Sequence, residues 1–389
     1  MIFFLARLFI KDYKQVESPY VRQGYGMLCG AFGIAFNIFL VIFKMLAGLI
    51  SGSIAVFSDA INNLSDVVSS VVTLVFFKLS GADADEEHPF GHGRLEYIAG
   101  LIVSLLIIIM AVELERTSVT KIFKPEGIVF SPVVTLILVV SMGVKLFMFI
   151  SYLRVAGAIN SSTIRSTAMD SLSDVLSTGI VLASLIVYRL TGVNIDGVAG
   201  ALVGIFILKT GIDSARDTIN PLLGEPPDRE FIDDIKALVM THGSILGVHD
   251  IVVHNYGPSR IMMSLHVEVP ADKTLIEIHD LIDEIEKELR QKYHCVAVIH
   301  MDPIDEKDTE TILAKECLEK TLKEMDRSIT FHDFRIVRKE GKNPLIEFDM
   351  EIPYEFYLED SIVVSRVESR LQEINPKYCF DIMVDKRQK

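Results

Sequence analysis

The chain has 389 residues, of which 50% are hydrophobic and 23% charged, and its formal net charge is −14. A mean hydropathy of +0.38 excludes a disordered or fibrous chain and is unusual for a soluble enzyme. An acidic chain without a basic stripe is a poor nucleic-acid binder, so we expect no nucleic-acid partner. The four cysteines form no Cys-x-x-Cys pair, which predicts reduced thiols rather than a disulfide or zinc framework.

The apolar residues are concentrated in the first half of the chain. A helix that crosses a bilayer needs about 20 mostly apolar residues. Six segments meet this requirement, namely 27–50, 55–79, 97–118, 127–152, 164–190 and 195–214. The stretch before them, residues 1–14, is too short to span a bilayer. Its sequence is compatible both with an amphipathic helix at the membrane interface and with a frayed tail. Basic residues in the short loops favour two cytoplasmic termini, so we predict a multi-pass protein of the cell membrane.

The second half of the chain contains a repeat. Segments beginning at Ser244 and Ser328 each alternate apolar and polar residues over two short runs, with a Gly-containing turn between them, and then show helical periodicity. Each is preceded by a further helical stretch and followed by a short apolar strand. We therefore expect two small α+β modules in series. The predicted domains are an N-terminal segment (1–26), a six-helix transmembrane domain (27–215), a first α+β domain (216–305) and a second module (306–389).

A second repeat lies inside the predicted spans. The segments "SDAINNLSDVVSS" (58–70) and "STAMDSLSDVLST" (166–178) align Asn62 with Asp170 and Asp66 with Asp174. In each segment the two residues are spaced i, i+4 and share one helix face. An ionised Asp at mid-membrane costs at least about 2.5 kcal/mol, and three close carboxylates repel one another unless a cation joins them. The pattern therefore predicts a cation site made of these four residues.

Two further groups of residues have metal-ligand spacing. Asp85, His88 and His92, after the second span, can meet on one helix face or in a turn, and a polar loop that caps the third span is the alternative. The first module carries His249, His266, His279, His300 and Asp302, for which scattered surface histidines are an equally good reading. His300 and Asp302 are spaced i, i+2 on a predicted strand, so both point to one face.

Taken together, the twin Asp motifs, "HPFGHGRLE" (88–96) and "VIHMDP" (298–303) resemble the cation diffusion facilitator family over roughly residues 27–305. The resemblance implies a homodimer with six membrane helices per protomer, a cytoplasmic ferredoxin-like domain, and efflux of divalent metal in exchange for protons. It also implies that Asn62, Asp66, Asp170 and Asp174 form the transport site. The loop group would be a second metal site, and the five residues of the first module would be a regulatory one.

The set Asn-Asp-Asp-Asp resembles that of manganese members of the family, whereas familiar zinc members have a histidine in it. Oxygen ligands suit hard cations. We therefore expect a proton-coupled Mn²⁺ exporter, with Fe²⁺, Cd²⁺ or Co²⁺ also possible as substrates. A zinc or iron(II) exporter of the same family and a membrane-anchored metal sensor are the alternatives. An enzyme is not expected, because no HExxH or GxSxG pattern is present.

The module at 306–389 lies outside the pattern of that family. It keeps His332 and Asp333 where the first module has His249 and Asp250, but Asp349 stands in place of His266. Because most of the other candidate ligands are lost as well, we expect a metal-free scaffold or interaction module.

Overall fold

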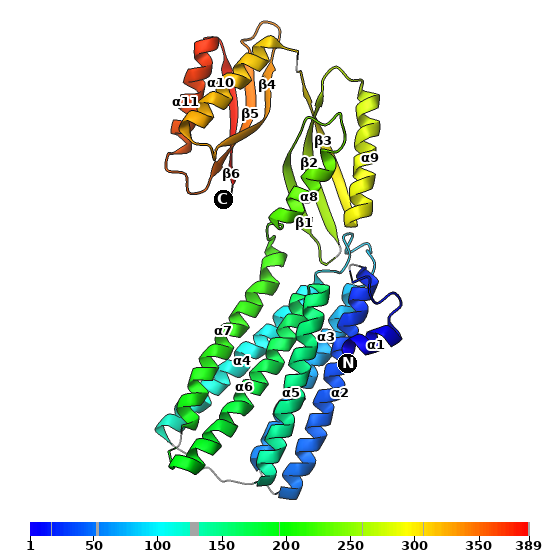
Figure 1. Ribbon diagram of the computed structural model, residues 1–389, viewed down its shortest axis with the longest axis vertical. Coiled ribbons are helices and arrows are strands. Elements are labelled where there is room, and N and C mark those ends of the chain that lie inside the picture. Colours follow the sequence, from blue (N-terminus) through cyan, green and yellow to red (C-terminus); the bar gives the residue numbers. More distant parts are fainter. Residues whose placement is uncertain are drawn as a thin grey trace. The chain divides into compact units, whose positions relative to one another are not determined.

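The structure, a computed structural model, describes residues 1–16, 18–51, 54–124, 132–193, 195–258, 260–305 and 307–387. The chain divides into two compact units. One contains Met1–Pro226 and His254–Ile261, and the other contains Pro227–Val253 and Met262–Lys389. The first unit holds the long helices, and the second holds two small sheets with their helices (Figure 1).

The first unit is a helix bundle. Its elements are α1 (Ile2–Phe9), α2 (Pro19–Ser51), α3 (Ile54–Ser80), α4 (Leu95–Phe123), α5 (Pro132–Ile159), α6 (Ser162–Thr191) and α7 (Asp196–Leu223). Six of the described helices, α2 to α7, are long and apolar enough to cross a membrane, which confirms the six predicted spans. Most of these helices extend beyond the apolar segments because helical hydrogen bonding continues into the polar residues at their ends. Residues 127–131 of the predicted fourth span lie outside the described part of the chain.

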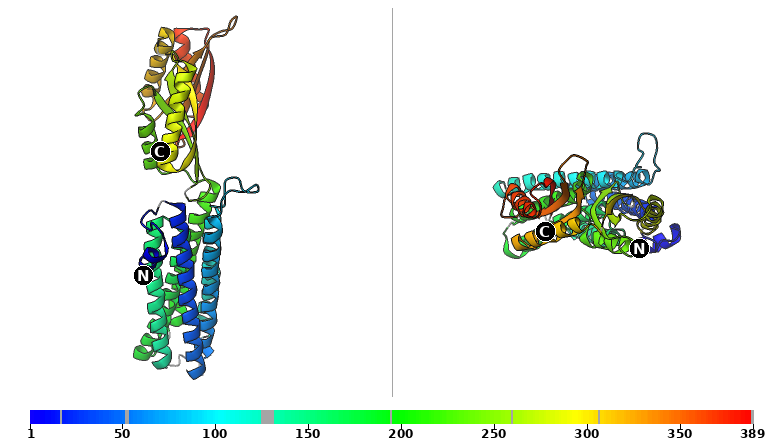
Figure 2. Two further views of the ribbon diagram at one scale, coloured as in Figure 1. Left: turned by 90° about the vertical axis from the view of Figure 1, so that its right-hand side faces the viewer. Right: turned by 90° about the horizontal axis from the view of Figure 1, so that it is seen from above.

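The long helices lie side by side, as Figures 1 and 2 show. Helix α2 packs mainly on α3, α4 on α7, and α5 on α6, and α6 also contacts α4 and α7. Close approach depends on small residues: a Cβ atom added to Gly30 of α2 would lie 2.7 Å from the Cα of Leu74 in α3. Small residues at helix contacts are the usual means by which membrane helices approach closely.

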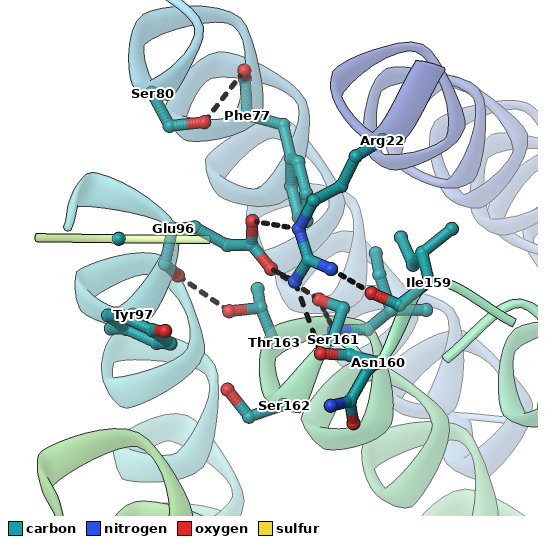
Figure 3. Close-up of polar contacts among 12 residues, drawn as sticks. Arg22, Phe77, Ser80, Glu96, Tyr97, Ile159, Asn160, Ser161, Ser162 and Thr163 are labelled. Carbon is teal, nitrogen blue, oxygen red and sulfur yellow. Dashed lines mark hydrogen bonds and ion pairs between the residues drawn. The ribbon is translucent and has the colours of Figure 1, made fainter. Parts of the chain in front are cut away.

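A buried ion pair joins three helices at one end of this bundle (Figure 3). The Arg22 guanidinium of α2 donates to both oxygens of Glu96 in α4, at 3.1 and 2.7 Å. Arg22 also donates to the carbonyls of Ile159 and Asn160 at the α5–α6 junction. The Ser161 hydroxyl donates to the same carboxylate at 2.6 Å. Only 3% of the Glu96 side chain is exposed, so this network fixes the helix ends around a desolvated charge pair.

The N-terminal stretch is helical rather than frayed. Ile2 and Ala6 of α1 are buried in the cluster that also contains Tyr25 of α2 and Tyr152 of α5. The opposite face of α1 leaves Phe4 and Leu8 exposed. Helix α1 thus has an exposed apolar face and a basic residue, Arg7, in its last turn. These features agree with the prediction of an amphipathic interfacial helix.

The second unit contains two modules of the same design. The first has α8 (Arg229–Val239), β1 (Gly247–Asn255), β2 (Ile261–Pro270), α9 (Leu275–Tyr293) and β3 (Cys295–Ile304). The second has α10 (Thr309–Met325), β4 (Thr330–Val337), β5 (Leu345–Pro353), α11 (Asp360–Ile374) and β6 (Cys379–Arg387). The strand orders are β1-β2-β3 and β4-β5-β6. Both predicted strand–turn–strand–helix repeats are therefore confirmed.

Each module is stabilised by helices that pack on one face of its sheet. In the second module β4 pairs antiparallel with β5, and β5 pairs parallel with β6. Alternate residues of β5, namely Ile346, Phe348, Met350 and Ile352, are buried against α10 and α11. The other face of each sheet carries the polar alternate residues, among them His266 and His300 of the first sheet.

Candidate metal-binding sites

The first candidate site lies within the helix bundle. Asp66 of α3 and Asp170 of α6 are buried polar residues, and Asp174 follows one helical turn after Asp170. The ammonium of Lys145 in α5 lies between two of these carboxylates, 2.7 Å from Asp66 Oδ2 and 2.6 Å from Asp174 Oδ2. The structure thus brings the two repeat motifs together around a fixed positive charge.

Amide groups complete the surroundings of Asp66. Asn63 Nδ2 donates to Asp66 Oδ2 at 3.0 Å, and Lys44 Nζ of α2 donates to Asn63 Oδ1 at 2.5 Å. Asn37 Nδ2 donates to the Asp66 carbonyl. The side chain of Asn62, the predicted amide ligand, lies outside the described part of the structure. The group at this site therefore combines carboxylates, amides and two ammonium groups.

Lys145 is a component of this site that was not predicted from the sequence. The signal was available, because Lys145 is the one charged residue between Pro132 and Leu153. An ionisable residue within a span is a functional candidate by default. Its partners could not be read from the sequence, because α5 carries no copy of the Asp motif and its rotation toward Asp66 and Asp174 is a tertiary property.

The second candidate site is the loop between α3 and α4. His88 Nδ1 lies 3.3 Å from Asp85 Oδ1, and His92 Nε2 lies 3.5 Å from Asp85 Oδ2. The residues converge in a turn rather than on a helix face, with Gly91 at a φ of 78°. The backbone N–H of His88 donates to Asp85 at 2.6 Å, and this contact holds the pKa of the carboxyl below its usual range. All three ligand atoms lie within 4.8 Å of one another, as a single metal ion requires.

The loop is contacted by residues 255–256, at the end of β1, which belong to the same unit. The rings of Phe90 and Tyr256 stack with centroids 4.4 Å apart, and the Arg94 guanidinium lies 4.6 Å from the Tyr256 ring centroid. Arg94 also donates to the carbonyl of Asn255, whose side chain donates to Tyr97. These contacts position the metal-ligand loop from a segment that the spacing of the motif does not include.

The third candidate site lies on the sheet of the first module. His266 Nδ1 of β2 is 3.0 Å from Asp302 Oδ2, and His249 Nε2 of β1 is 3.4 Å from the same oxygen. His300 Nε2 lies 3.3 Å from Asp302 Oδ1. The structure brings these four residues together, whereas His279 lies exposed on α9, where its Nδ1 is 4.0 Å from Asp280 Oδ1. His249, His266 and Asp302 place one ligand atom each within 4.8 Å of one another.

The surroundings of His249 favour its protonated form. Burial disfavours its protonated form, but the hydrogen bond with Asp250 and the negative charges of Asp302 and Glu268 outweigh burial and raise its pKa. A proton and a metal ion therefore compete for a ring that is already surrounded by carboxylates. Such an arrangement favours cations of either kind.

The chain matches two family profiles and a series of known transporters. The profile described as "Cation efflux transmembrane domain" matches residues 31–223, and the one described as "Cation efflux protein, cytoplasmic domain" matches residues 227–304. An uncharacterized transporter of Methanocaldococcus jannaschii is 30% identical over 293 residues, which cover 75% of this chain and all of the relative.

Two further relatives carry names that state a metal function. The cation-efflux pump FieF of Klebsiella pneumoniae is 26% identical over 288 residues, covering 73% of this chain and 95% of the relative. The manganese efflux system protein MneS of Bacillus subtilis is 27% identical over 281 residues, covering 70% and 94%. These matches agree with the six membrane-spanning helices and the clustered metal ligands of the structure. The chain therefore belongs to the cation efflux family of divalent-metal transporters, also called the cation diffusion facilitator family.

Proposed function

We propose that this protein exports Mn²⁺ in exchange for protons, using Asn62, Asp66, Asp170 and Asp174 as its transport site. The choice of Mn²⁺ is based on the composition of the spans: none of the ten histidines lies in a membrane-spanning helix of the described structure. Carboxylate and amide oxygens suit Mn²⁺, whereas imidazole suits zinc and its softer neighbours. The manganese function in the name of the MneS relative supports the same choice.

Lys145 has a defined part in the proposed cycle. In the absence of metal its ammonium neutralises the charges of Asp66 and Asp174, from which it lies 2.7 and 2.6 Å. A metal ion that binds these oxygens competes with the ammonium for them. After the metal leaves, protons on the carboxylates and the returning ammonium restore the metal-free site, because a protonated carboxyl is a poor ligand. The fixed charge thus prevents metal from binding too tightly to be released.

The remaining predicted properties belong to the same proposal. We place both termini and the second unit in the cytoplasm, on the basis of the Lys and Arg bias of the loops, and we propose a homodimer in the cell membrane. The transport domain (27–215) is served by two metal-sensing positions: the loop group of Asp85, His88 and His92, and the cluster around Asp302 in the first soluble domain (216–305). His279 remains a predicted member of that cluster.

The test is metal-by-metal flux in reconstituted vesicles under an imposed pH gradient. We expect Mn²⁺ to move faster than Zn²⁺ or Fe²⁺ and to be accompanied by proton movement in the opposite direction. Zinc moving fastest would transfer the assignment to a zinc exporter. No flux of any metal, together with tight metal binding, would indicate a membrane-anchored sensor.

A substitution at Asn62 tests the ligand assignment. Asn62→His replaces an amide oxygen with an imidazole nitrogen, so the ratio of Mn²⁺ to Zn²⁺ flux should fall. His is also introduced at the exposed Leu64 of the same helix as a control, and Leu64→His should leave the ratio unchanged. An unchanged ratio in Asn62→His would remove this residue from the transport site.

A further inference from the structure

A second group of metal ligands lies where the two soluble modules meet. His249 and Asp250 are neighbours on β1 of the first module, and His332 lies on β4 of the second. His249 Nδ1 is 3.3 Å from Asp250 Oδ2, and His332 Nε2 is 3.4 Å from Asp250 Oδ1. The three residues place one ligand atom each within 4.8 Å of one another. One metal ion could reach all three ligand atoms at this separation, and two imidazoles with one carboxylate are a ligand set of the zinc type.

The two modules have the same backbone conformation where they contact each other. Asp250 and Asp333 both have a left-handed backbone, with φ of 48° and 53°, and in β4 the pairing with β5 shifts register after His332. The two His-Asp pairs are equivalent by sequence repeat and by backbone conformation. Their rings stack with centroids 4.4 Å apart and an interplanar angle of 22°.

His332 lacks the partners that a buried imidazole needs. Its side chain is 9% exposed, and neither Nδ1 nor Nε2 makes a hydrogen bond within the described residues. A buried polar group without a hydrogen bond destabilises a fold unless another interaction replaces it. Two stacked rings would repel if both were protonated. A metal ion bound by neutral rings removes both difficulties.

We propose that His249, Asp250 and His332 bind a divalent transition-metal ion of the zinc type, which joins the two soluble modules. His249 ligates through Nδ1, which faces Asp250, while its Nε2 lies 3.4 Å from Asp302 Oδ2 without a hydrogen bond. Because a neutral imidazole offers one lone pair, His249 serves either this ion or one held by His266 and Asp302. The second module is then a metal-binding partner of the first, which replaces the expectation of a metal-free scaffold. The inference goes beyond the proposed transport function and does not rest on it.

The test uses the full-length protein in detergent, stripped of metal with a chelator and titrated with Co²⁺ and Zn²⁺. His332→Asn should weaken the binding of one ion at least about tenfold, while His254→Asn, an exposed histidine of β1 outside this group, should not. His332→Cys should retain the ion and add a thiolate-to-cobalt charge-transfer band in the near ultraviolet that the wild type and His254→Cys lack. Thermal unfolding without metal checks that the variants are folded.

The outcomes separate the proposal from its competitors. A new charge-transfer band in His332→Cys with weakened binding in His332→Asn supports a site at this junction. Wild-type Co²⁺ affinity in His332→Asn, or a folded His332→Cys without the band, overturns it and leaves the stacked histidines as a packing contact. Both results are binding measurements, so they neither support nor refute the assignment of the transport site.

Discussion

Lys145 shows how a single side chain changes the chemistry of the intramembrane site. Three carboxylates from two helices would repel one another in a medium of low dielectric constant. The ammonium of Lys145 contacts one carboxylate from each helix, at 2.7 Å to Asp66 and 2.6 Å to Asp174. It therefore joins α3 to α6 at the proposed transport site.

Removing a carboxylate should abolish transport. Asp66→Asn and Asp174→Asn each replace a charged ligand by a neutral one, and the remaining groups do not neutralise a divalent ion in a buried site. Flux in vesicles should fall to the level of protein-free vesicles. Asp213→Asn is the matched control, because Asp213 lies on α7 and is half exposed. Wild-type flux in either well-expressed site variant would refute the assignment.

Removing the ammonium should have a different effect. Lys145→Gln abolishes the competition between the fixed charge and the metal, so the KM for Mn²⁺ should fall by about tenfold, equivalent to about 1.4 kcal/mol. Maximal flux should fall as well, because the metal is released more slowly. The KM and the maximal flux are obtained from flux measured against metal concentration.

Lys145→Arg serves as the control for this variant, since it keeps the charge and should keep the KM near that of the wild type. If Lys145→Gln leaves both the KM and the maximal flux unchanged, the ammonium has no part in the transport cycle.

One ion pair, between Arg22 and Glu96, connects the ends of α2 and α4 with the α5–α6 junction. Arg22 and Glu96 are far apart in sequence, and each is satisfied by further hydrogen bonds, including that from Ser161 to Glu96. Buried pairs of this kind are destabilising to break because the remaining charge stays desolvated. The pair therefore helps to set the position of α4 and of the start of α6, the helix that carries the proposed transport residues Asp170 and Asp174.

Glu96→Gln should destabilise the bundle by about 3–5 kcal/mol, because it leaves Arg22 buried without its counter-charge. The apparent melting temperature in detergent should fall clearly below that of the wild type. Glu113→Gln on the same helix removes an exposed pair with Arg116, and its effect should stay within about 1 kcal/mol. Equal melting temperatures for the two variants would show that the Arg22–Glu96 pair does not stabilise the bundle.

In the whole molecule, the second module has a hydrophobic core of its own. Most of its contacts are internal: its core is formed by α10, α11 and the buried face of β5. The linker between β3 and α10 spans residues 305–308, a short polar segment. Interfaces between domains resemble transient protein interfaces, so we expect the first module to keep its core without the second.

Deleting residues 306–389 should leave metal flux per dimer within about twofold of the wild type, because the cut falls in a polar linker with few packed contacts. The purified truncated protein should retain its oligomeric state by size-exclusion chromatography and lose the ion that His332 helps to bind. Loss of flux from an intact, folded dimer would show that the second module takes part in the transport cycle.

Local patterns in the sequence were enough to establish the six spans and both α+β repeats. Hydropathy over about 20 residues, period-2 alternation and helical periodicity are properties of neighbouring residues. The spacing i, i+4 also placed Asp170 and Asp174 on one face of a helix, and the resemblance extended this to the family and to metal efflux. These conclusions needed no knowledge of which elements touch.

Tertiary structure decided which charged groups meet. Lys145 contacts Asp66 and Asp174 only because α5 packs beside α6 and turns this residue inward, and nothing in the local sequence specifies that rotation. His332 likewise reaches Asp250 from 82 positions further along the chain. Short-range periodicity determines the face of an element on which a residue lies, whereas the partner across that face depends on packing between elements distant in sequence.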